Sequence, residues 1–430
     1  MKRLDESLQD PGQLSWQSPA ALNYSRALKI CFIVEPLHAG VGRHVIDIAC
    51  GMAGRGHDVH VVYSPVRLEP RYLAELNRHP RIRCHAIKMM PGLCAGDFAA
   101  FWQVKDYVKK NGPFDIVHGE SSKGGGFARL LKPFGVKNVL YSPHAFVTLS
   151  PVLPAAKRWA FRTIERLLSC WTDTLVCSSQ NEHDHAVSLG IPAQRLALVI
   201  NGTPSSQSGD RLSMREKLGL DADTVVIGFA GRLEAQKAPQ RLIQACERLL
   251  PQMPNMHLLM IGDGPLRAQL QARIDRAGLK ERVTWLGAVN AVHYMPAMDV
   301  FAVPSLYEGF AYVLLEALHA GLPIIATPIG GASESVLPGK NGFIVPQTPV
   351  EPMISALRQL GLDADLRRRM ALASAEHTGH FSTSRMIDGM EGLYRQAMDK
   401  GRRRQIARSA AAPQAEPQLI WKRARAYRPD

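Results

Sequence analysis

The chain has 430 residues, of which 46% are hydrophobic and 21% are charged, a globular composition that excludes an intrinsically disordered chain. Its net charge of +14 is uneven, because residues 1–200 carry 24 Lys and Arg against 16 Asp and Glu, residues 201–400 carry 20 of each, and residues 401–430 carry 8 against 2. This distribution is typical of proteins that meet a membrane surface, a phosphorylated substrate or nucleic acid, and equally of a soluble protein with a basic surface.

The cysteines and the first residues bear on location. The seven cysteines are odd in number and have no Cys-x-x-Cys spacing, which argues against a disulfide framework or a zinc site and favours a reducing compartment. Residues 1–27 form a polar extension with no apolar core of a signal peptide, and no 18-residue run is free of charge and polar breaks. We therefore expect a cytoplasmic protein.

The first half of the chain alternates strands and helices. A buried strand over 28–35 is followed by a glycine loop, a helix over 43–55 and a strand over 57–63. A helix is expected over 157–171, and further strands are expected over 115–118, 138–142 and 174–177. Such alternation predicts a parallel sheet covered by helices on both faces.

The second half repeats this pattern after a Ser-, Gly- and Pro-containing linker near 201–212. Helices are expected over 239–250 and 311–320, and strands over 225–230, 257–262, 282–286, 299–303, 323–326 and 343–345. The sequence thus predicts an α/β protein with two doubly wound, Rossmann-like domains, 28–203 and 213–380, and a cleft where the carboxyl ends of the strands meet. Residues 401–430 are predicted to be a basic, mostly disordered tail.

Two loops at strand ends are suited to a diphosphate. Gly40 and Gly42 precede the first helix, where they would let backbone amides approach a phosphate, although a plain tight turn explains them as well. Arg232 and Lys237 follow the first strand of the second half, where two fixed cations could neutralise a leaving diphosphate or simply be solvated.

The most specific pattern is a pair of glutamates eight residues apart. Glu308 lies in a glycine loop and Glu316 lies two turns into an apolar helix, where a solvated carboxylate is not expected. The backbone amides of Phe310, Ala311 and Tyr312 open this helix and can face an anion. His144 ends a strand of the first half and is either a cleft histidine or a satisfied core histidine.

Two apparent metal motifs have simpler explanations. Asp-x-Asp occurs at Asp221 and at Asp363, where a turn and a helix N-cap account for the residues. His183 and His185 are two apart on a predicted helix and cannot share a face. No metal site is therefore predicted.

Taken together, these motifs resemble the retaining glycosyltransferases of family 4, the glycosyl transferases group 1, which have the GT-B fold. The resemblance covers about residues 28–396 and is strongest over 225–346, where the sequence reads GFAGRLEAQKAP, LLMIGDGPL, VTWLGAV, DVFAVPSLYEGFAYVLLEALHAGLPIIATPIGGASESV and NGFIVP in the family's order. The first half matches through HAGVGRHV, DIVHGESSKGGGFAR, YSPHAF and VCSSQNE.

The resemblance implies a role for each candidate residue. Glu308 would hold hydroxyls of the transferred sugar and Glu316 the ribose of the nucleotide, while His144 would sit beside the anomeric carbon. The remaining roles are diphosphate binding by Arg232 and Lys237, amide contacts from Phe310, Ala311 and Tyr312, approach from the other domain by Gly40 and Gly42, and a base site near Leu286 and Val289. A C-terminal helix over 381–400 would cross back to the first domain. Ala311 and Tyr312 stand where the family commonly has Gly-Leu or Gly-Ile, so we expect Tyr312 to reshape the sugar pocket.

The resemblance further implies a nucleoside-diphosphate sugar as substrate, no cofactor and no metal. Because the first domain takes the acceptor and is basic, we expect a glycan or polyprenyl-linked acceptor, used in making an exopolysaccharide or similar bacterial surface glycan at an anionic membrane face. A soluble acceptor and a sugar-nucleotide epimerase on the same scaffold are the alternatives. A nucleic-acid partner is not expected, because no basic-aromatic interleaving occurs.

Overall fold

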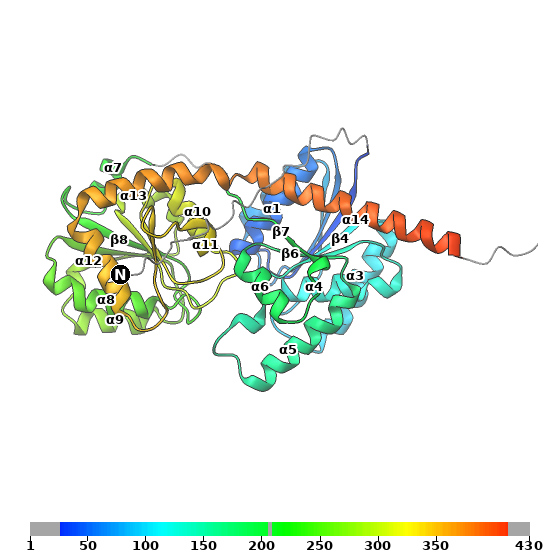
Figure 1. Cartoon of the computed structure of the whole chain (residues 1–430), viewed down its shortest axis with the longest axis horizontal. Coiled ribbons are helices and arrows are strands. Elements are labelled where there is room, and N and C mark those ends of the chain that lie inside the picture. The colour runs from blue at the N-terminus through cyan, green and yellow to red at the C-terminus, as the bar shows by residue number, and fades with distance from the viewer. Residues whose placement is uncertain (1–25, 205–208, 412–430) are drawn as a thin grey trace, which may run out of the picture.

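The computed structural model describes residues 26–204 and 209–411, which form two domains, each built on a parallel sheet with helices on both faces (Figure 1). The α/β class with two doubly wound domains, predicted from the sequence, is confirmed. The extension up to residue 25, residues 205–208 of the linker and residues 412–430 of the tail lie outside the described residues.

The first sheet has seven parallel strands in the order β3-β2-β1-β4-β5-β6-β7, and the order in which strands are added reverses between β1 and β4. Its strands are β1 Lys29–Val34, β2 Asp58–Tyr63, β3 Ile82–Ala86, β4 Ile116–Glu120, β5 Val139–Ser142, β6 Thr174–Cys177 and β7 Leu196–Leu198. Its helices are α1 Ala39–Gly54, α2 Pro70–Asn77, α3 Gly96–Asn111, α4 Ser121–Leu130, α5 Ala155–Leu168 and α6 Gln180–Ser188.

The second sheet has six strands in the order β10-β9-β8-β11-β12-β13. Its strands are β8 Val225–Ala230, β9 Met256–Ile261, β10 Val283–Gly287, β11 Val300–Val303, β12 Ile324–Ala326 and β13 Gly342–Ile344. Its helices are α7 Arg211–Lys217, α8 Pro239–Leu249, α9 Arg267–Arg276, α10 Tyr312–His319, α11 Ala332–Ser335, α12 Glu351–Leu362 and α13 Ala364–His377.

Alternation along each first strand fills a core on both faces of its sheet. In β1, Ile30 and Phe32 join the cluster beneath α1, whereas Cys31 and Ile33 join the cluster with residues of α3 and α4. Strand β8 divides its residues between two clusters in the same way. Both faces of these strands are therefore buried, which is why their sequences read as continuous apolar runs.

Helix α14, Thr383–Ala411, crosses from the second domain onto α1 of the first (Figure 1). Tyr394 is fully buried there, and its hydroxyl lies 2.9 Å from Nδ1 of His118. The helix continues beyond residue 400, so the tail predicted to be disordered is helical to Ala411.

An ion-pair cluster fixes α14 to the first domain. Arg55 Nη1 donates to Glu391 Oε2 at 2.7 Å, and Arg395 Nη2 donates to Glu391 Oε1 at 2.6 Å. Partial burial opposes ionisation of Glu391, but the hydrogen bonds from Arg55 and Arg395 outweigh it and lower its pKa to about 2.

We expect Glu391→Gln to destabilise the protein at neutral pH by about 1 kcal/mol, a value reduced for the solvent exposure of the cluster. A pKa below the unfolded value of about 4.3 means that this stabilisation is complete above that pH and is lost as the pH falls towards 2. Urea unfolding should therefore give a difference between the two proteins that shrinks on acidification. Glu376→Gln, at an exposed position of α13, is the control. A difference that is independent of pH would contradict the linkage.

Candidate active site

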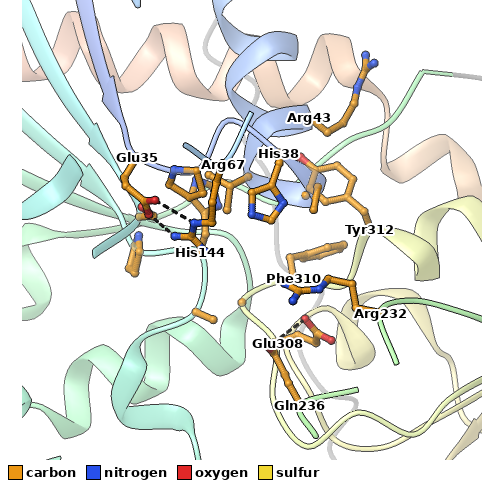
Figure 2. A pocket seen from close by; sticks show the side chains of 18 of the residues that line it. Glu35, His38, Arg43, Arg67, His144, Arg232, Gln236, Glu308, Phe310 and Tyr312 are labelled. Atoms are coloured by element: carbon orange, nitrogen blue, oxygen red, sulfur yellow. Dashed lines mark hydrogen bonds and ion pairs between the residues drawn. The ribbon is translucent and has the colours of Figure 1, made fainter. Parts of the chain in front are cut away.

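A cleft of about 2030 Å³ lies between the two domains and is lined by residues of both (Figure 2). All the predicted site residues line it except Gly42 and Leu286: they are Gly40, His144, Arg232, Lys237, Val289, Glu308, Phe310, Ala311, Tyr312 and Glu316. Residues far apart in the sequence are therefore gathered at one place by the loops at the carboxyl ends of the strands.

The glycine loop is shorter than predicted, because α1 already begins at Ala39, so that Gly40 and Gly42 lie in its first turn. A Cβ at Gly42 would come within 2.7 Å of the ring of Tyr72, and a Cβ at Gly40 would lie 3.3 Å from the ring of Tyr312. Gly42 therefore permits the packing of α1 on α2, whereas Gly40 is the glycine that meets the second domain. The first amide of the helix, that of Ala39, donates to Glu69 Oε1 at 2.7 Å.

The basic side chains of the second domain differ in their surroundings. Lys237 Nζ donates to Glu308 Oε1 at 2.6 Å, and Gln236 Nε2 lies 3.3 Å from Glu308 Oε2. Arg232 is more exposed and pairs with Glu234 at 3.0 Å. Glu308, predicted to hold a sugar, is thus already held in place by its neighbours.

Glu316 faces the same cleft from α10 and is a partly desolvated carboxylate. Its carboxylate has no hydrogen bond or ion pair with any of the described residues. Burial raises the pKa of Glu316, and the positive charges of Lys237, Arg43 and Arg71 oppose that rise. A carboxylate desolvated without a partner, on the wall of a cleft, is a candidate for ligand binding.

The start of α10 does not offer three free amides as predicted. The amide of Ala311 donates to the carbonyl of Gly330 at 3.1 Å, while the amides of Phe310 and Tyr312 have no backbone acceptor among the described residues. The hydroxyl of Tyr312 is buried and likewise has no hydrogen-bond partner among them. Tyr312 instead spans the cleft towards α1, close to Arg43 (Figure 2).

His144 is held by a carboxylate that sequence reasoning missed. Its Nε2 lies 2.6 Å from Oε2 of Glu120, which ends β4 and is fully buried. His144 has φ +54 and the next residue, Ala145, has φ +88, a left-handed conformation that is uncommon for residues other than glycine. His144 is therefore both a cleft residue and a satisfied one, so the two interpretations of the sequence apply together.

Two further histidines extend this network into the first domain. The rings of His44 and His144 are 4.6 Å apart, His44 Nδ1 lies 3.1 Å from Asn201 Oδ1, and His118 contacts Glu120 at 3.4 Å. Burial is the main cause that lowers the pKa of His44, His118 and His144 to about 4 each. All three rings are accordingly neutral at neutral pH.

One group within this network has the composition of a metal site. Ligand atoms of His44, Glu120 and His144 all lie within 4.8 Å of one another, and Nε2 of His44 and Oε1 of Glu120 have no hydrogen-bond partner among the described residues. Two histidines and a carboxylate could bind a cation.

The Asp-x-Asp motif at Asp363 does cap a helix, since its Oδ1 accepts from the amide of Leu366 at 2.8 Å.

Additional charged residues of the first domain line the cleft without having been predicted. Arg67 forms a two-pronged ion pair with the buried Glu35, and His38 lies between Arg67 and Arg232 (Figure 2). Burial, followed by the charges of these two arginines, lowers the pKa of His38. The first-domain side of the cleft is thus rich in histidine and arginine.

Two family models match this architecture. Residues 210–377 match the model described as glycosyl transferases group 1, and residues 39–202 match the glycosyl transferase 4-like domain. The second domain belongs to the glycosyl transferases group 1 family, and the first is a glycosyl transferase 4-like domain. The family predicted from the sequence is confirmed, and the protein is a glycosyltransferase.

Relatives and solved structures agree with this assignment. The chain is 29% identical to the D-inositol 3-phosphate glycosyltransferase of Stackebrandtia nassauensis, over 88% of this chain and 89% of that protein. It is 28% identical to the UDP-Gal:alpha-D-GlcNAc-diphosphoundecaprenol alpha-1,3-galactosyltransferase of Escherichia coli, over 71% of this chain and 82% of that one. The structure of Anabaena Alr3699/HepE in complex with UDP-glucose matches with a TM-score of 0.71 at 22% identity, over 85% of this chain and 99% of that chain. The predicted GT-B fold of this glycosyltransferase is confirmed.

Proposed function

We propose that this glycosyltransferase moves a hexosyl unit from a nucleoside-diphosphate sugar to a hydroxyl of a glycan or lipid-linked acceptor, with retention of configuration. The observation that carries the proposal is the cleft itself, in which Lys237, Glu308 and Glu316 of the second domain share one cavity with His144 of the first. Cations and a glutamate pair on one side suit a donor, and a neutral histidine on the other suits an acceptor hydroxyl.

The donor half of the site would act by electrostatics. As the glycosidic bond breaks, negative charge develops on the leaving diphosphate, and Arg232 and Lys237 are positioned to neutralise it. Lys237 already lies against Glu308, so a diphosphate would share this cation with a carboxylate that accepts sugar hydroxyls. Glu316, which lacks a protein partner among the described residues, would accept hydrogen bonds from the ribose.

Retention is assigned to front-face attack, in which the departing phosphate receives the proton of the acceptor hydroxyl. A double displacement would need a carboxylate at the anomeric carbon. Glu120 is the carboxylate beside His144, but it is fully buried and does not line the cleft. Its buried position beside His144 supports a role in orienting that histidine rather than one as a nucleophile.

The acceptor is proposed to be a polyprenyl-linked sugar at the inner face of a membrane, as in the synthesis of an exopolysaccharide. The acceptor named for the galactosyltransferase of Escherichia coli is a diphosphoundecaprenol-linked sugar, which supports this class. Within residues 26–204 and 209–411, no helix is long and apolar enough to cross a bilayer. The attachment to the membrane that we propose is peripheral.

The proposed function is tested by donor binding and product stereochemistry. Thermal-shift titration with UDP-, GDP- and ADP-sugars should give one nucleotide class that stabilises the wild type, and Glu316→Ala should lose that shift while keeping its unfolding temperature. With a polyprenyl-diphosphate sugar as acceptor, NMR should give a product with the donor's anomeric configuration. An inverted product, or epimerisation of the donor without an acceptor, would contradict the proposal.

We further expect transfer to be independent of divalent metal, because two cations and helix amides can meet the charge of the diphosphate. Turnover after dialysis against EDTA should equal that of untreated enzyme. Because His44, Glu120 and His144 could bind a cation, zinc, manganese and magnesium are each added back. Loss of activity that one of these metals restores would overturn the expectation.

A further inference from the structure

Helix α5 and the loop before it expose large apolar side chains to solvent. Val152 is 72% exposed, Trp159 is 70% exposed and Leu167 is 66% exposed, and Ile164 and Trp171 are also exposed. In Figure 1, α5 lies at the lower margin of the first domain, on the side away from α14. Such a concentration of exposed apolar side chains on one helix and the residues that flank it is unusual for a protein that meets only water.

The charges on this segment are almost all positive. Residues 147–171 contain Lys157, Arg158, Arg162 and Arg166, and their single acidic residue is Glu165. Glu165 is buried and neutralised inside the domain, because Arg129 Nη1 donates to it at 2.6 Å. The surface that α5 presents is therefore apolar and basic, which is the composition of helices that lie in the interface of an anionic bilayer.

The loop before α5 is held in shape by the helix. Arg158 Nη2 donates to the backbone carbonyls of Ser150 at 3.0 Å, Pro151 at 3.2 Å and Leu153 at 3.3 Å. Val152 is consequently presented to solvent at the tip of a fixed turn. Trp159 and Leu167 lie eight residues apart, close to two helical turns, so they occupy the same side of α5.

The inner side of α5 is continuous with the active-site cleft. Phe161, Ile164 and Leu168 line that cleft together with apolar residues of α3 and α4, namely Phe98, Phe101, Phe127 and Leu130. Phe98 and the neighbouring Leu93 are themselves 73% and 77% exposed. The cleft thus has an apolar branch in the first domain, with exposed apolar side chains on α5 and around the start of α3.

We propose that α5 with residues 147–154 is the surface by which this glycosyltransferase docks on an anionic lipid bilayer. The apolar branch of the cleft then receives the hydrocarbon part of the acceptor as it leaves that bilayer. This inference rests on the proposed function, because it takes the acceptor to be linked to a lipid. It goes beyond the overall basic charge, because it names the segment that enters the membrane and the route from there to His144.

The test is flotation of the full-length protein with phosphatidylcholine vesicles, with and without phosphatidylglycerol. Trp159→Glu with Leu167→Glu should lower the partition coefficient on anionic vesicles about tenfold or more, because two apolar side chains no longer enter the interface. Lys157→Ala and Arg166→Ala should each lower it about fivefold at low salt. The matched control places the same changes at Leu362 and Leu372, which are 73% and 62% exposed in the second domain, and should bind as wild type does.

A second measurement locates the helix directly. Brominated lipids should quench tryptophan fluorescence in the wild type, and Trp159→Phe should remove most of that quenching. The inference is overturned if the α5 variants bind vesicles as well as wild type does, if the Leu362 and Leu372 control loses binding equally, or if deletion of 412–430 alone abolishes binding.

Donor binding separates this inference from the proposed function. The α5 variants should keep the wild-type thermal shift with the nucleotide sugar, because α5 lies on the acceptor side. Vesicle binding by the α5 variants that equals that of the wild type, together with an intact donor shift, would reject the docking surface and leave the function standing. Absence of any nucleotide-sugar shift in the wild type would reject the function, whatever the vesicles show.

Discussion

Lys237→Ala is expected to lower kcat/KM for transfer by about 10²–10³-fold, the effect of removing one preorganised charge from a developing anion. In the free enzyme, Lys237 Nζ already forms an ion pair with Glu308 Oε1, at a distance of 2.6 Å. In the proposed mechanism, removing this lysine therefore has two consequences: the diphosphate loses a cation, and Glu308 loses the partner that fixes its direction. Since both interactions strengthen as the leaving group departs, kcat should fall more than donor affinity.

Steady-state kinetics with the identified donor measures this effect. Lys237→Arg tests charge against geometry, because arginine keeps the charge but not the point contact of an ammonium group. Lys280→Ala, at an exposed position after α9, is the control for loss of one positive charge in the same domain. Unchanged kcat/KM in Lys237→Ala would remove this residue from the mechanism.

The sequence predicted the strands well because their signal is local. Strand β6 was expected over 174–177 and is Thr174–Cys177, and β8 was expected over 225–230 and is Val225–Ala230. A strand buried on both faces is apolar almost throughout, so its ends lie next to polar residues, as Asp173 and Ser178 flank β6. Glu308, Glu316 and Lys237 could be placed in the cleft for a related reason, because the fold class brings the loops after the strands to one edge.

The remaining features depend on contacts that no local pattern records. The start of α1 was expected near Arg43, but the helix begins at Ala39, where the carboxylate of Glu69 accepts the first amide from 30 residues away. Tyr312 was expected to change the sugar pocket, and its contact with Gly40 joins residues of different domains. The tail was expected to be disordered because of its composition alone. Composition does not show that residues 401–411 continue α14, a helix whose earlier part packs on α1.

Glu120 is the most consequential residue that the sequence interpretation left out. The strand was expected to end at His118, and the glutamate two positions later was not singled out as a site residue. Its partner His144 lies 24 residues on, in the loop after the neighbouring strand β5, and His44 comes from α1. An acidic residue at the carboxyl end of a central strand was the available signal, because such positions face the ligand edge of the sheet.

Glu120→Gln is expected to lower kcat about 10²-fold with little change in the KM for the donor. An ionised Glu120 has no hydrogen to give, so the bond of 2.6 Å requires Nε2 of His144 to carry the proton. Nδ1 is then the nitrogen that can accept a hydrogen bond from a substrate hydroxyl. A glutamine can donate as well as accept, so the substitution no longer fixes which nitrogen is protonated, while the volume of the side chain stays the same.

A double-mutant cycle separates this positioning role from a merely structural one. If Glu120 acts through His144, His144→Ala and the double variant should have nearly the same kcat, because the glutamate has no further effect once its histidine is gone. Additive losses would mean that Glu120 supports the fold or the site independently. Elemental analysis of the same proteins tests whether His44, Glu120 and His144 bind a metal. Metal that is present in the wild type and absent in Glu120→Gln would show that these residues are metal ligands. The metal-independent mechanism would then be wrong.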